Sequence, residues 1–120
     1  MAPKFRAWLK EEKRMTDVHE MTFIDGEVYL ISDITGFYAY EEFKLMQSTG
    51  LKDKNGKEIF EGDIVKYKLG GDAFTDIVAY NNWRACFYLK DDTGDALCSF
   101  DYLLDDVRMD EVEVIGNQYS

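Results

Sequence analysis

The chain has 120 residues, a formal net charge of -10, and a hydrophobic content of 46% with 15% aromatic residues. This length suits one domain with one packed core, and the composition argues against an intrinsically disordered protein. No apolar run approaches the roughly 20 residues of a membrane helix and the N-terminal segment has no signal-peptide core, so we expect a cytoplasmic protein that does not insert into a membrane.

The N-terminal part of the sequence predicts short strands separated by turns. The alternation from Lys4 to Leu9 is typical of a strand, and the charged run Lys10 to Arg14 predicts a solvated turn. Val18 to Ile24 and Glu27 to Ser32 are expected to pair as a hairpin, because Asp25-Gly26 between them suits the positive φ angles of a tight turn.

The next segment contains a turn and an ambiguous stretch. Asp33 to Gly36 predicts the turn, whereas Phe37 to Phe43 fits either a strand or a single helical turn. Lys44 to Met46 then leads into the long central stretch of the chain.

Four residues of this central stretch are predicted to shape the backbone. Asn55 and Gly56 suit the centre of a type I′ turn. Gly50, Gly56 and Gly62 follow one another at six-residue spacing, which would supply the sharp bends that a small barrel needs where a strand changes side.

The second half of the sequence predicts further antiparallel strands. Ile64 to Leu69, Ala73 to Tyr80 and Trp83 to Lys90 read as strands joined by tight turns at Gly70-Gly71 and Asn81-Asn82. The alternation in the last of these strands predicts one core-facing side, made of Trp83, Ala85, Phe87 and Leu89.

The C-terminal part predicts two more strands and a short helix. Ala96 to Phe100 can pair back on the preceding strand, and Glu111 to Ile115 forms the last strand. Apolar residues at positions 100, 103, 104 and 107 have helical spacing, with Ser99 as the N-cap.

Three blocks of the sequence resemble the YopX family of small bacteriophage and prophage proteins: Lys4 to Trp8, Leu45 to Lys66 and Glu113 to Asn117. The resemblance implies a compact, mostly β protein related to SH3-type barrels and intracellular in an infected bacterium. Family members are expected to continue with an acidic, proline-containing tail, whereas this chain ends at Gln118-Tyr119-Ser120.

The expected fold is therefore mainly β. Together with the resemblance, which implies the SH3-like barrel, the pattern leads us to expect a small single-domain SH3-like β-barrel spanning residues 1–120, with an additional N-terminal β-hairpin region and at most one or two short helices.

No residue pattern predicts a catalytic, cofactor or metal site. His19 is the only histidine, and Cys86 and Cys98 lack the paired spacing of a zinc site. We expect both cysteines to be buried thiols, with a disulfide as the alternative. The resemblance supplies no catalytic residues either, because the family has no accepted active-site motif, so we do not expect an enzyme.

The sequence favours a protein-binding or adaptor module with a host or phage partner. Aromatic side chains carry much of the energy of protein interfaces, although core packing is the competing role for each of them. Self-association belongs to the same hypothesis, because exposed edge strands pair readily. The candidate binding residues are Trp8, Tyr38, Tyr40, Tyr67, Tyr88 and Tyr102.

The alternative is a function related to nucleic acids. Residues 91–120 contain nine acidic side chains and one arginine, a charge of -8, which disfavours binding to duplex DNA. A small barrel could instead bind single strands through stacked aromatic side chains, or its acidic surface could act as a DNA mimic.

Overall fold

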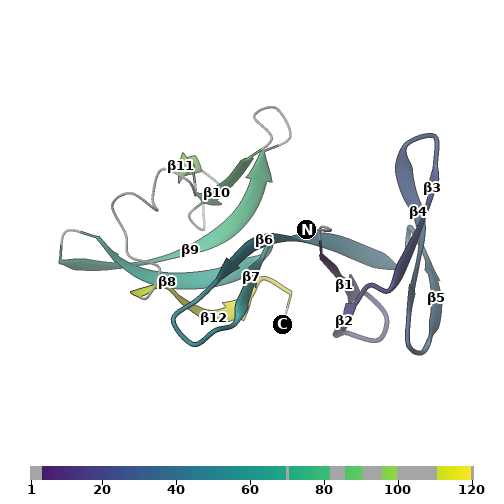
Figure 1. Ribbon diagram of the computed structural model, residues 1–120, viewed down its shortest axis with the longest axis horizontal. Coiled ribbons are helices and arrows are strands. Elements are labelled where there is room, and N and C mark those ends of the chain that lie inside the picture. Colours follow the sequence, from purple (N-terminus) through teal and green to yellow (C-terminus); the bar gives the residue numbers. More distant parts are fainter. Residues whose placement is uncertain (1–3, 70, 82–85, 91–95, 100–110, 120) are drawn as a thin grey trace. The chain divides into compact units, whose positions relative to one another are not determined.

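The computed structural model describes residues 4–69, 71–81, 86–90, 96–99 and 111–119, and all of its secondary-structure elements are β-strands (Figure 1). All strand pairings are antiparallel. The prediction of a mainly β protein is therefore confirmed. The chain divides into two compact units, Met1–Gln47 and Ser48–Ser120, whereas the single domain expected from the sequence stays a prediction.

The first unit contains five complete strands and the first half of a sixth. Strand β1 pairs with β2 on one side and with the start of β6 on the other, while β3, β4 and β5 form a three-stranded sheet in that order. The bounds are β1 Phe5–Leu9, β2 Arg14–Asp17, β3 Glu20–Ile24, β4 Glu27–Asp33, β5 Gly36–Ala39 and β6 Phe43–Lys52.

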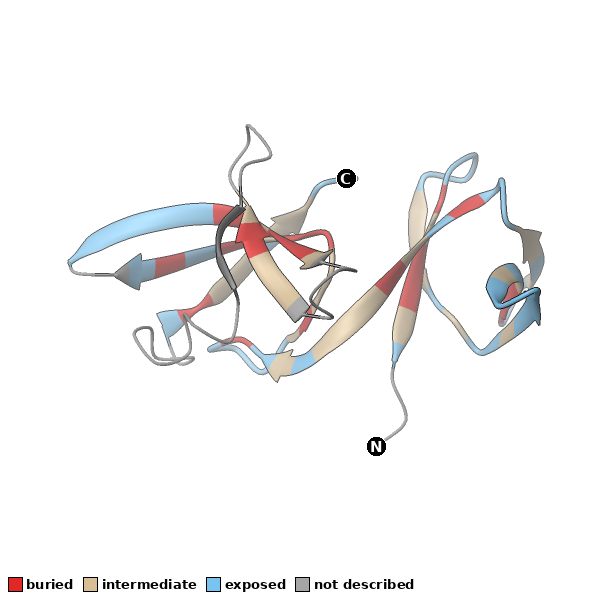
Figure 2. Ribbon diagram, turned by 90° about the horizontal axis from the view of Figure 1, so that it is seen from above, coloured by how far each residue is buried: buried red, intermediate tan, exposed pale blue. Residues whose placement is uncertain are grey.

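The core of the first unit lies between these strands. Ala7 and Leu9 of β1, Ile31 of β4 and Phe43 of β6 are its buried residues. Across the three-stranded sheet, Ile31 pairs with Met21 on one side and Tyr38 on the other, and both of these side chains pack against the core. The row of Met21, Ile31 and Tyr38 is therefore fixed by burial, and Figure 2 shows buried, half-buried and exposed segments following one another along the strands.

Two elements of the first unit differ from the prediction or resolve its alternatives. The segment Arg14 to Asp17 is a strand, β2. It was not predicted, because the charged run before it was assigned to a solvated turn. Lys13 takes a φ of 52° and donates from its backbone to Leu9 at 2.8 Å, which reverses the chain one residue before the predicted turn ends. The ambiguous stretch after Gly36 is resolved as strand β5 followed by a turn rather than a helix.

The second unit is built around a curved five-stranded sheet with the order β11-β10-β9-β8-β12 (Figure 1). Strand β7 lies outside this sheet and pairs with the second half of β6. Ile59, Val65, Val78 and Leu89 are among the buried residues of the core. The bounds are β7 Glu58–Phe60, β8 Asp63–Leu69, β9 Asp72–Asn81, β10 Cys86–Lys90, β11 Ala96–Ser99 and β12 Glu113–Asn117.

The turn at Asn55-Gly56 is not the predicted type I′ turn. Gly56 has a φ of 81°, but Asn55 does not have a positive φ. The carboxylate of Asp53 accepts hydrogen bonds from the backbone N–H groups of Asn55 (2.8 Å) and Lys57 (2.9 Å), and Gly56 N–H donates to the Asp53 carbonyl at 3.0 Å. This aspartate turn keeps Asn55 at negative φ and leaves only the glycine left-handed.

The C-terminal half differs from the prediction at the end of β9. Asn81 pairs with Cys86, so it belongs to β9 and the tight turn expected at Asn81-Asn82 is wrong. The predicted helix, Trp83 and Ala85 lie outside the described residues, and Ser99 is the last residue of β11. In the parts of the chain that the structure describes, no helix is long and apolar enough to cross a bilayer.

Candidate functional site

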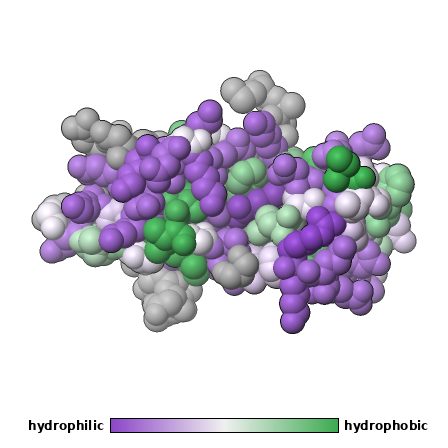
Figure 3. Space-filling view, turned by 90° about the horizontal axis from the view of Figure 1, so that it is seen from below, coloured by the Kyte–Doolittle hydropathy of each residue, from purple (hydrophilic) through white to green (hydrophobic). Residues whose placement is uncertain are grey.

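Exposed apolar side chains gather in the first unit, on and beside the β3-β4-β5 sheet. Six of the eight large hydrophobic side chains that are exposed among the described residues belong to this unit. Phe37 is 69% and Tyr40 53% exposed, values that core packing does not explain. Figure 3 shows one face of the molecule, where hydrophobic patches interrupt a mostly hydrophilic surface. The six residues are Phe23, Ile24, Tyr29, Ile34, Phe37 and Tyr40.

Three of these side chains line an open pocket of about 220 Å³, which we call the aromatic pocket. Its lining residues are Ile24, Glu27, Val28, Tyr29 and Tyr40. The Tyr29 and Tyr40 ring centroids lie 5.6 Å apart with an interplanar angle of 36°, a tilted aromatic pair. The pocket therefore combines two aromatic rings, an aliphatic wall and one carboxylate.

The β3-β4 hairpin positions three sides of the aromatic pocket. Asp25 and Gly26 have φ angles of 52° and 82°, which form the predicted tight reversal and set Ile24 opposite Glu27. The register then shifts: Thr22 pairs with Leu30 and Phe23 with Val28, so Tyr29 is left without a partner in the ladder. A bulge of this kind changes the direction in which neighbouring side chains point. It lies at Tyr29, whose ring contacts the ring of Tyr40.

Tyr40 follows β5 in a turn that is held by glutamates. The Ala39 N–H donates to Glu42 Oε2 at 3.3 Å, and the Glu42 N–H donates to the Ala39 carbonyl at 2.8 Å. The Tyr40 hydroxyl donates to Glu41 Oε1 at 3.0 Å, and this hydrogen bond, followed by the negative charge of Glu41, raises the pKa of Tyr40. The phenol therefore stays protonated and neutral at physiological pH.

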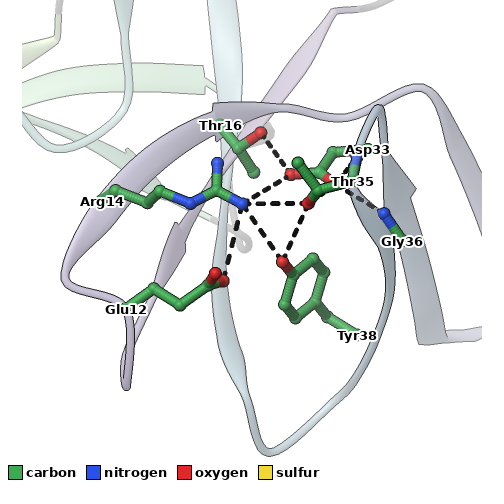
Figure 4. Close-up of polar contacts among 7 residues, drawn as sticks. All are labelled: Glu12, Arg14, Thr16, Asp33, Thr35, Gly36 and Tyr38. Carbon is green, nitrogen blue, oxygen red and sulfur yellow. Dashed lines mark hydrogen bonds and ion pairs between the residues drawn. The ribbon is translucent and has the colours of Figure 1, made fainter.

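A second group of contacts, the Asp33 network, fastens the β4-β5 hairpin to β2 (Figure 4). Arg14 Nη2 donates to Asp33 Oδ2 at 3.2 Å, to Thr35 Oγ1 at 3.1 Å and to the Tyr38 hydroxyl at 3.1 Å. Thr16 Oγ1, also on β2, donates to Asp33 Oδ2 at 2.7 Å. The hairpin that leads to Tyr40 is thus held by side chains from three different elements.

The Asp33 carboxylate is the centre of this network. Its other oxygen, Oδ1, accepts from the Thr35 hydroxyl at 2.6 Å, the Thr35 N–H at 2.8 Å and the Gly36 N–H at 3.1 Å. The Thr35 hydroxyl contributes most to lowering the pKa of Asp33; burial opposes this shift, and Thr16 and Arg14 add to it, so the pKa lies far below its usual range. The carboxylate therefore stays ionised at neutral pH and holds the β4-β5 hairpin through these hydrogen bonds.

Beside this network lies a second pocket of about 140 Å³. It is lined by the glutamates Glu11, Glu12 and Glu42 together with Leu9 and Tyr38. Glu12 Oε2 already lies 3.5 Å from Arg14 Nη2, so part of its negative charge is compensated within the protein. This pocket has one aromatic ring, whereas the aromatic pocket has two.

The sequence segment that forms the aromatic pocket carries acidic but no basic side chains. Between Arg14 and Lys44 the sequence contains seven acidic residues and neither lysine nor arginine. Of these acidic residues, Asp33 is the one that forms an ion pair with Arg14. The segment that carries the exposed aromatic residues is therefore acidic, and within it Glu27 lines the aromatic pocket, which favours a cation there.

The six aromatic residues predicted to bind a partner have different environments. Tyr40 is exposed and joins the aromatic pocket, while Trp8, Tyr38 and Tyr88 are half-buried. Tyr67 is 4% exposed in the core, where its hydroxyl contacts Asp76 and its ring stacks on Phe74, so core packing accounts for it. Tyr102 lies outside the described residues.

The prediction missed most of the exposed apolar residues of the first unit. Ile24 precedes the Asp25-Gly26 turn, and Ile34 occupies the turn between Asp33 and Gly36. Large apolar residues in or beside a tight turn cannot readily point into a core, because the turn lies at the surface. This position in the sequence was the signal that could have identified them.

The described residues place no group of three or more His, Cys, Asp or Glu side chains where it could hold a metal ion. The β10-β11 register sets Cys98 opposite Leu89, three residues along the strand from Cys86. The side chains of both cysteines lie outside the described part of the structure, so the expected buried thiols and the disulfide alternative stay predictions.

Comparison with known proteins identifies the family. The crystal structure of protein EF1440 from Enterococcus faecalis is similar, with a TM-score of 0.67 and 30% sequence identity over 99% of this chain and 94% of that chain. No curated protein matches the chain. The sequence pattern of the YopX protein family matches residues 4–120, and the chain therefore belongs to this family.

Proposed function

We propose that this protein is a non-enzymatic protein-binding or adaptor module and that the first unit supplies its binding surface. The observation that carries the proposal is the set of exposed apolar residues on and beside the β3-β4-β5 sheet. Isolated exposed apolar residues are common, but several of them around one pocket are typical of an interaction surface. Aromatic anchors such as Tyr29 and Tyr40 are the residue types that dominate binding energy in protein interfaces.

The proposal includes an SH3-like barrel for the second unit and an intracellular role in a bacterium that carries the phage or prophage. The curvature of the five-stranded antiparallel sheet supports the first part. The second part is supported by the family resemblance. The Asp33 network also supports a binding role, since it fixes the hairpin that leads to Tyr40 and so reduces the entropy lost on binding.

Capture from a bacterial lysate, followed by reconstitution with the purified partner, tests the proposed surface. Phe37→Ser and Tyr40→Ser are expected to weaken the reconstituted complex more than tenfold, because hot-spot aromatics contribute at least about 2 kcal/mol. Ile115→Ser is the matched control, since Ile115 is a similarly exposed apolar residue of the second unit. An equal loss with the control variant contradicts the assignment of the surface to the first unit.

Sedimentation of the parent and the same variants tests whether the protein self-associates. A concentration-dependent dimer that Phe37→Ser dissociates would identify a second copy of the chain as the partner. A strict monomer that also captures no protein would overturn the proposed function.

The nucleic-acid alternative makes a different prediction about salt. Exposed aromatic rings could stack on bases, but the surrounding carboxylates repel the phosphates. We expect no shift of single-stranded DNA at physiological salt, and tight binding of bare DNA would replace the proposed function. A DNA mimic would instead compete with DNA for a captured protein and lose this effect as salt increases.

A further inference from the structure

We propose that the aromatic pocket binds an arginine side chain of a protein partner. This inference deepens the proposed function by naming the chemistry that the partner presents. It rests on three features of one site: the ring pair of Tyr29 and Tyr40, the carboxylate of Glu27, and the lack of basic residues in the surrounding sequence.

The two rings supply the first part of the recognition. A cation within about 6 Å of a tyrosine ring centre is attracted to the negative face of the ring, and arginine makes this contact more often than lysine. The tilted pair has ring centroids 5.6 Å apart, and both tyrosines line the pocket. A planar guanidinium can also stack on such a ring, which a compact ammonium group cannot do.

The carboxylate supplies the second part. Glu27 lines the same pocket as the two rings and is exposed to solvent. A carboxylate can accept two parallel hydrogen bonds from a guanidinium, which adds direction to the attraction of charge. Ile24 and Val28 complete the wall with aliphatic surface, against which the methylene groups of an arginine can pack.

The negative charge of the surrounding sequence is the third feature of the recognition. It argues against ligands other than a cation. Residues 15–43 carry seven carboxylates and no lysine or arginine, so this protein offers no cation of its own from that stretch. An acidic or phosphorylated ligand would meet repulsion, and an uncharged apolar ligand would leave Glu27 without a partner. The second pocket already has Arg14 beside Glu12 and has less need of an added cation.

The test is an NMR titration of the isotope-labelled full chain with N-acetyl-arginine methylamide. We expect saturable shifts that centre on the backbone amides of Ile24, Glu27 and Val28 and on the rings of Tyr29 and Tyr40. The same titration with the citrulline analogue, which keeps the shape but not the charge, should give little response. The lysine analogue should bind more weakly than the arginine analogue.

Paired variants separate the pocket from general attraction to an acidic protein. Tyr40→Leu should weaken binding about two- to fivefold, the range that a cation–π contact supplies at an exposed site. Glu27→Gln should weaken it by a similar factor, whereas Glu20→Gln removes an equal charge from β3 outside the pocket and should have little effect. Dispersed amide spectra of each variant confirm that it is folded.

Three results would overturn the inference: equal weakening by Glu20→Gln and Glu27→Gln, equal binding of the citrulline analogue, or shifts centred on Glu11 and Glu12. Absence of any saturable shift would also overturn it. None of these results depends on a captured partner, so the inference can fail while Phe37→Ser still weakens a complex. Conversely, a chain that captures no partner can still bind the arginine probe.

Discussion

Asp33 shows how a single side chain can organise the neighbourhood of a binding surface. Its carboxylate accepts five hydrogen bonds, from Arg14, Thr16, Thr35 and Gly36, while its side chain is almost completely buried. An amide in its place loses the charge and turns one acceptor into a donor. The groups that donate to that oxygen in the parent protein would then lack an acceptor, so the substitution weakens several hydrogen bonds at once.

The Asp33→Asn variant should therefore be markedly less stable than the parent protein. We expect the free energy of unfolding to fall by roughly 2–3 kcal/mol, the scale for hydrogen bonds to a charged group. Urea denaturation followed by tryptophan fluorescence measures this change. Glu12→Gln breaks the longer, more exposed ion pair with Arg14 and should cost less than about 1 kcal/mol. Equal losses in the two variants would show that Asp33 is not the centre of the network.

The pH dependence of stability provides an independent test of Asp33. Its pKa is lowered from 3.8 in the folded protein, so the unfolded state binds a proton at higher pH than the folded state does. The stabilisation is present above about pH 4 and is lost as the pH falls through the folded pKa. Urea midpoints between pH 2 and pH 5 should fall less steeply with acid in Asp33→Asn than in the parent. Parallel pH profiles would contradict this assignment.

Gly62 is the residue where the predicted barrel corner can be tested. Its φ is 90°, its N–H donates to the Val78 carbonyl at 2.8 Å, and its carbonyl accepts from Gln118 at 2.9 Å. Gly62→Val should destabilise the protein by more than about 1 kcal/mol, because a β-branched residue is strained at this φ. Gly116→Val is the control, since Gly116 lies in strand β12, has no positive φ, and has open space where a Cβ would lie. Equal thermal stability of Gly62→Val and the parent would show that Gly62 does not form a barrel corner.

Residues that obey a local rule were predictable, and residues that depend on distant partners were not. Asp25-Gly26 forms its tight reversal as expected, because the two residues themselves tolerate positive φ. Asp33 was predicted only as part of a turn, since Arg14 and Thr16 lie 19 and 17 positions away from it. The pairing of Tyr29 with Tyr40 likewise depends on a bulge that has no signal in the sequence.

At the scale of elements, the turn after β6 connects two parts of the second unit. Asp53 binds its own loop through Asn55 and Lys57, and its Oδ2 accepts from the Val114 N–H of β12 at 2.9 Å. Burial raises the pKa of Asp53, but the N–H groups of Val114, Lys57 and Asn55 outweigh this effect, so that the pKa is lowered. The carboxylate thus holds a hairpin loop and a strand 61 positions apart.

Asp53→Ala should loosen both elements together. We expect a loss of roughly 1–3 kcal/mol, the cost of leaving three part-buried N–H donors without their acceptor. Native-state hydrogen exchange should show faster exchange at Asn55, Lys57 and Val114. Lys54→Ala, which removes only the exposed ion pair with Glu113, should leave these amides nearly unchanged. Faster exchange confined to Asn55 and Lys57 would mean that Asp53 does not hold β12.

Strands were easier to predict than their pairing or their exact bounds. Alternation identified β1, whereas the turn signals at Asp25-Gly26 and Gly70-Gly71 marked out β4, β8 and β9. It failed for β2, whose four residues include three polar or charged ones and lie beside a charged turn. The type I′ turn at Asn55 failed because the Asp53 side chain, two positions earlier, imposes a different turn.

At the scale of the whole molecule, one strand is shared by the two compact units. Strand β6 belongs to both: residues 43–47 pair with β1, and residues 48–52 pair with β7. Unfolding either unit would remove the hydrogen-bonding partner from half of a continuous ten-residue strand. Loss of order in one half would therefore fray the other, which favours a single cooperative transition.

Scanning calorimetry tests this expectation directly. A single domain of 120 residues should melt in one transition with an enthalpy of roughly 80 kcal/mol near 60 °C, and the calorimetric and van't Hoff enthalpies should agree. Asp33→Asn perturbs the first unit and Asp53→Ala the second, so the two variants report on each unit separately. In a one-domain protein both variants lower the same transition. Two transitions, each shifted by only one variant, would instead establish two independent domains, because neither unit would then sense the loss of the other.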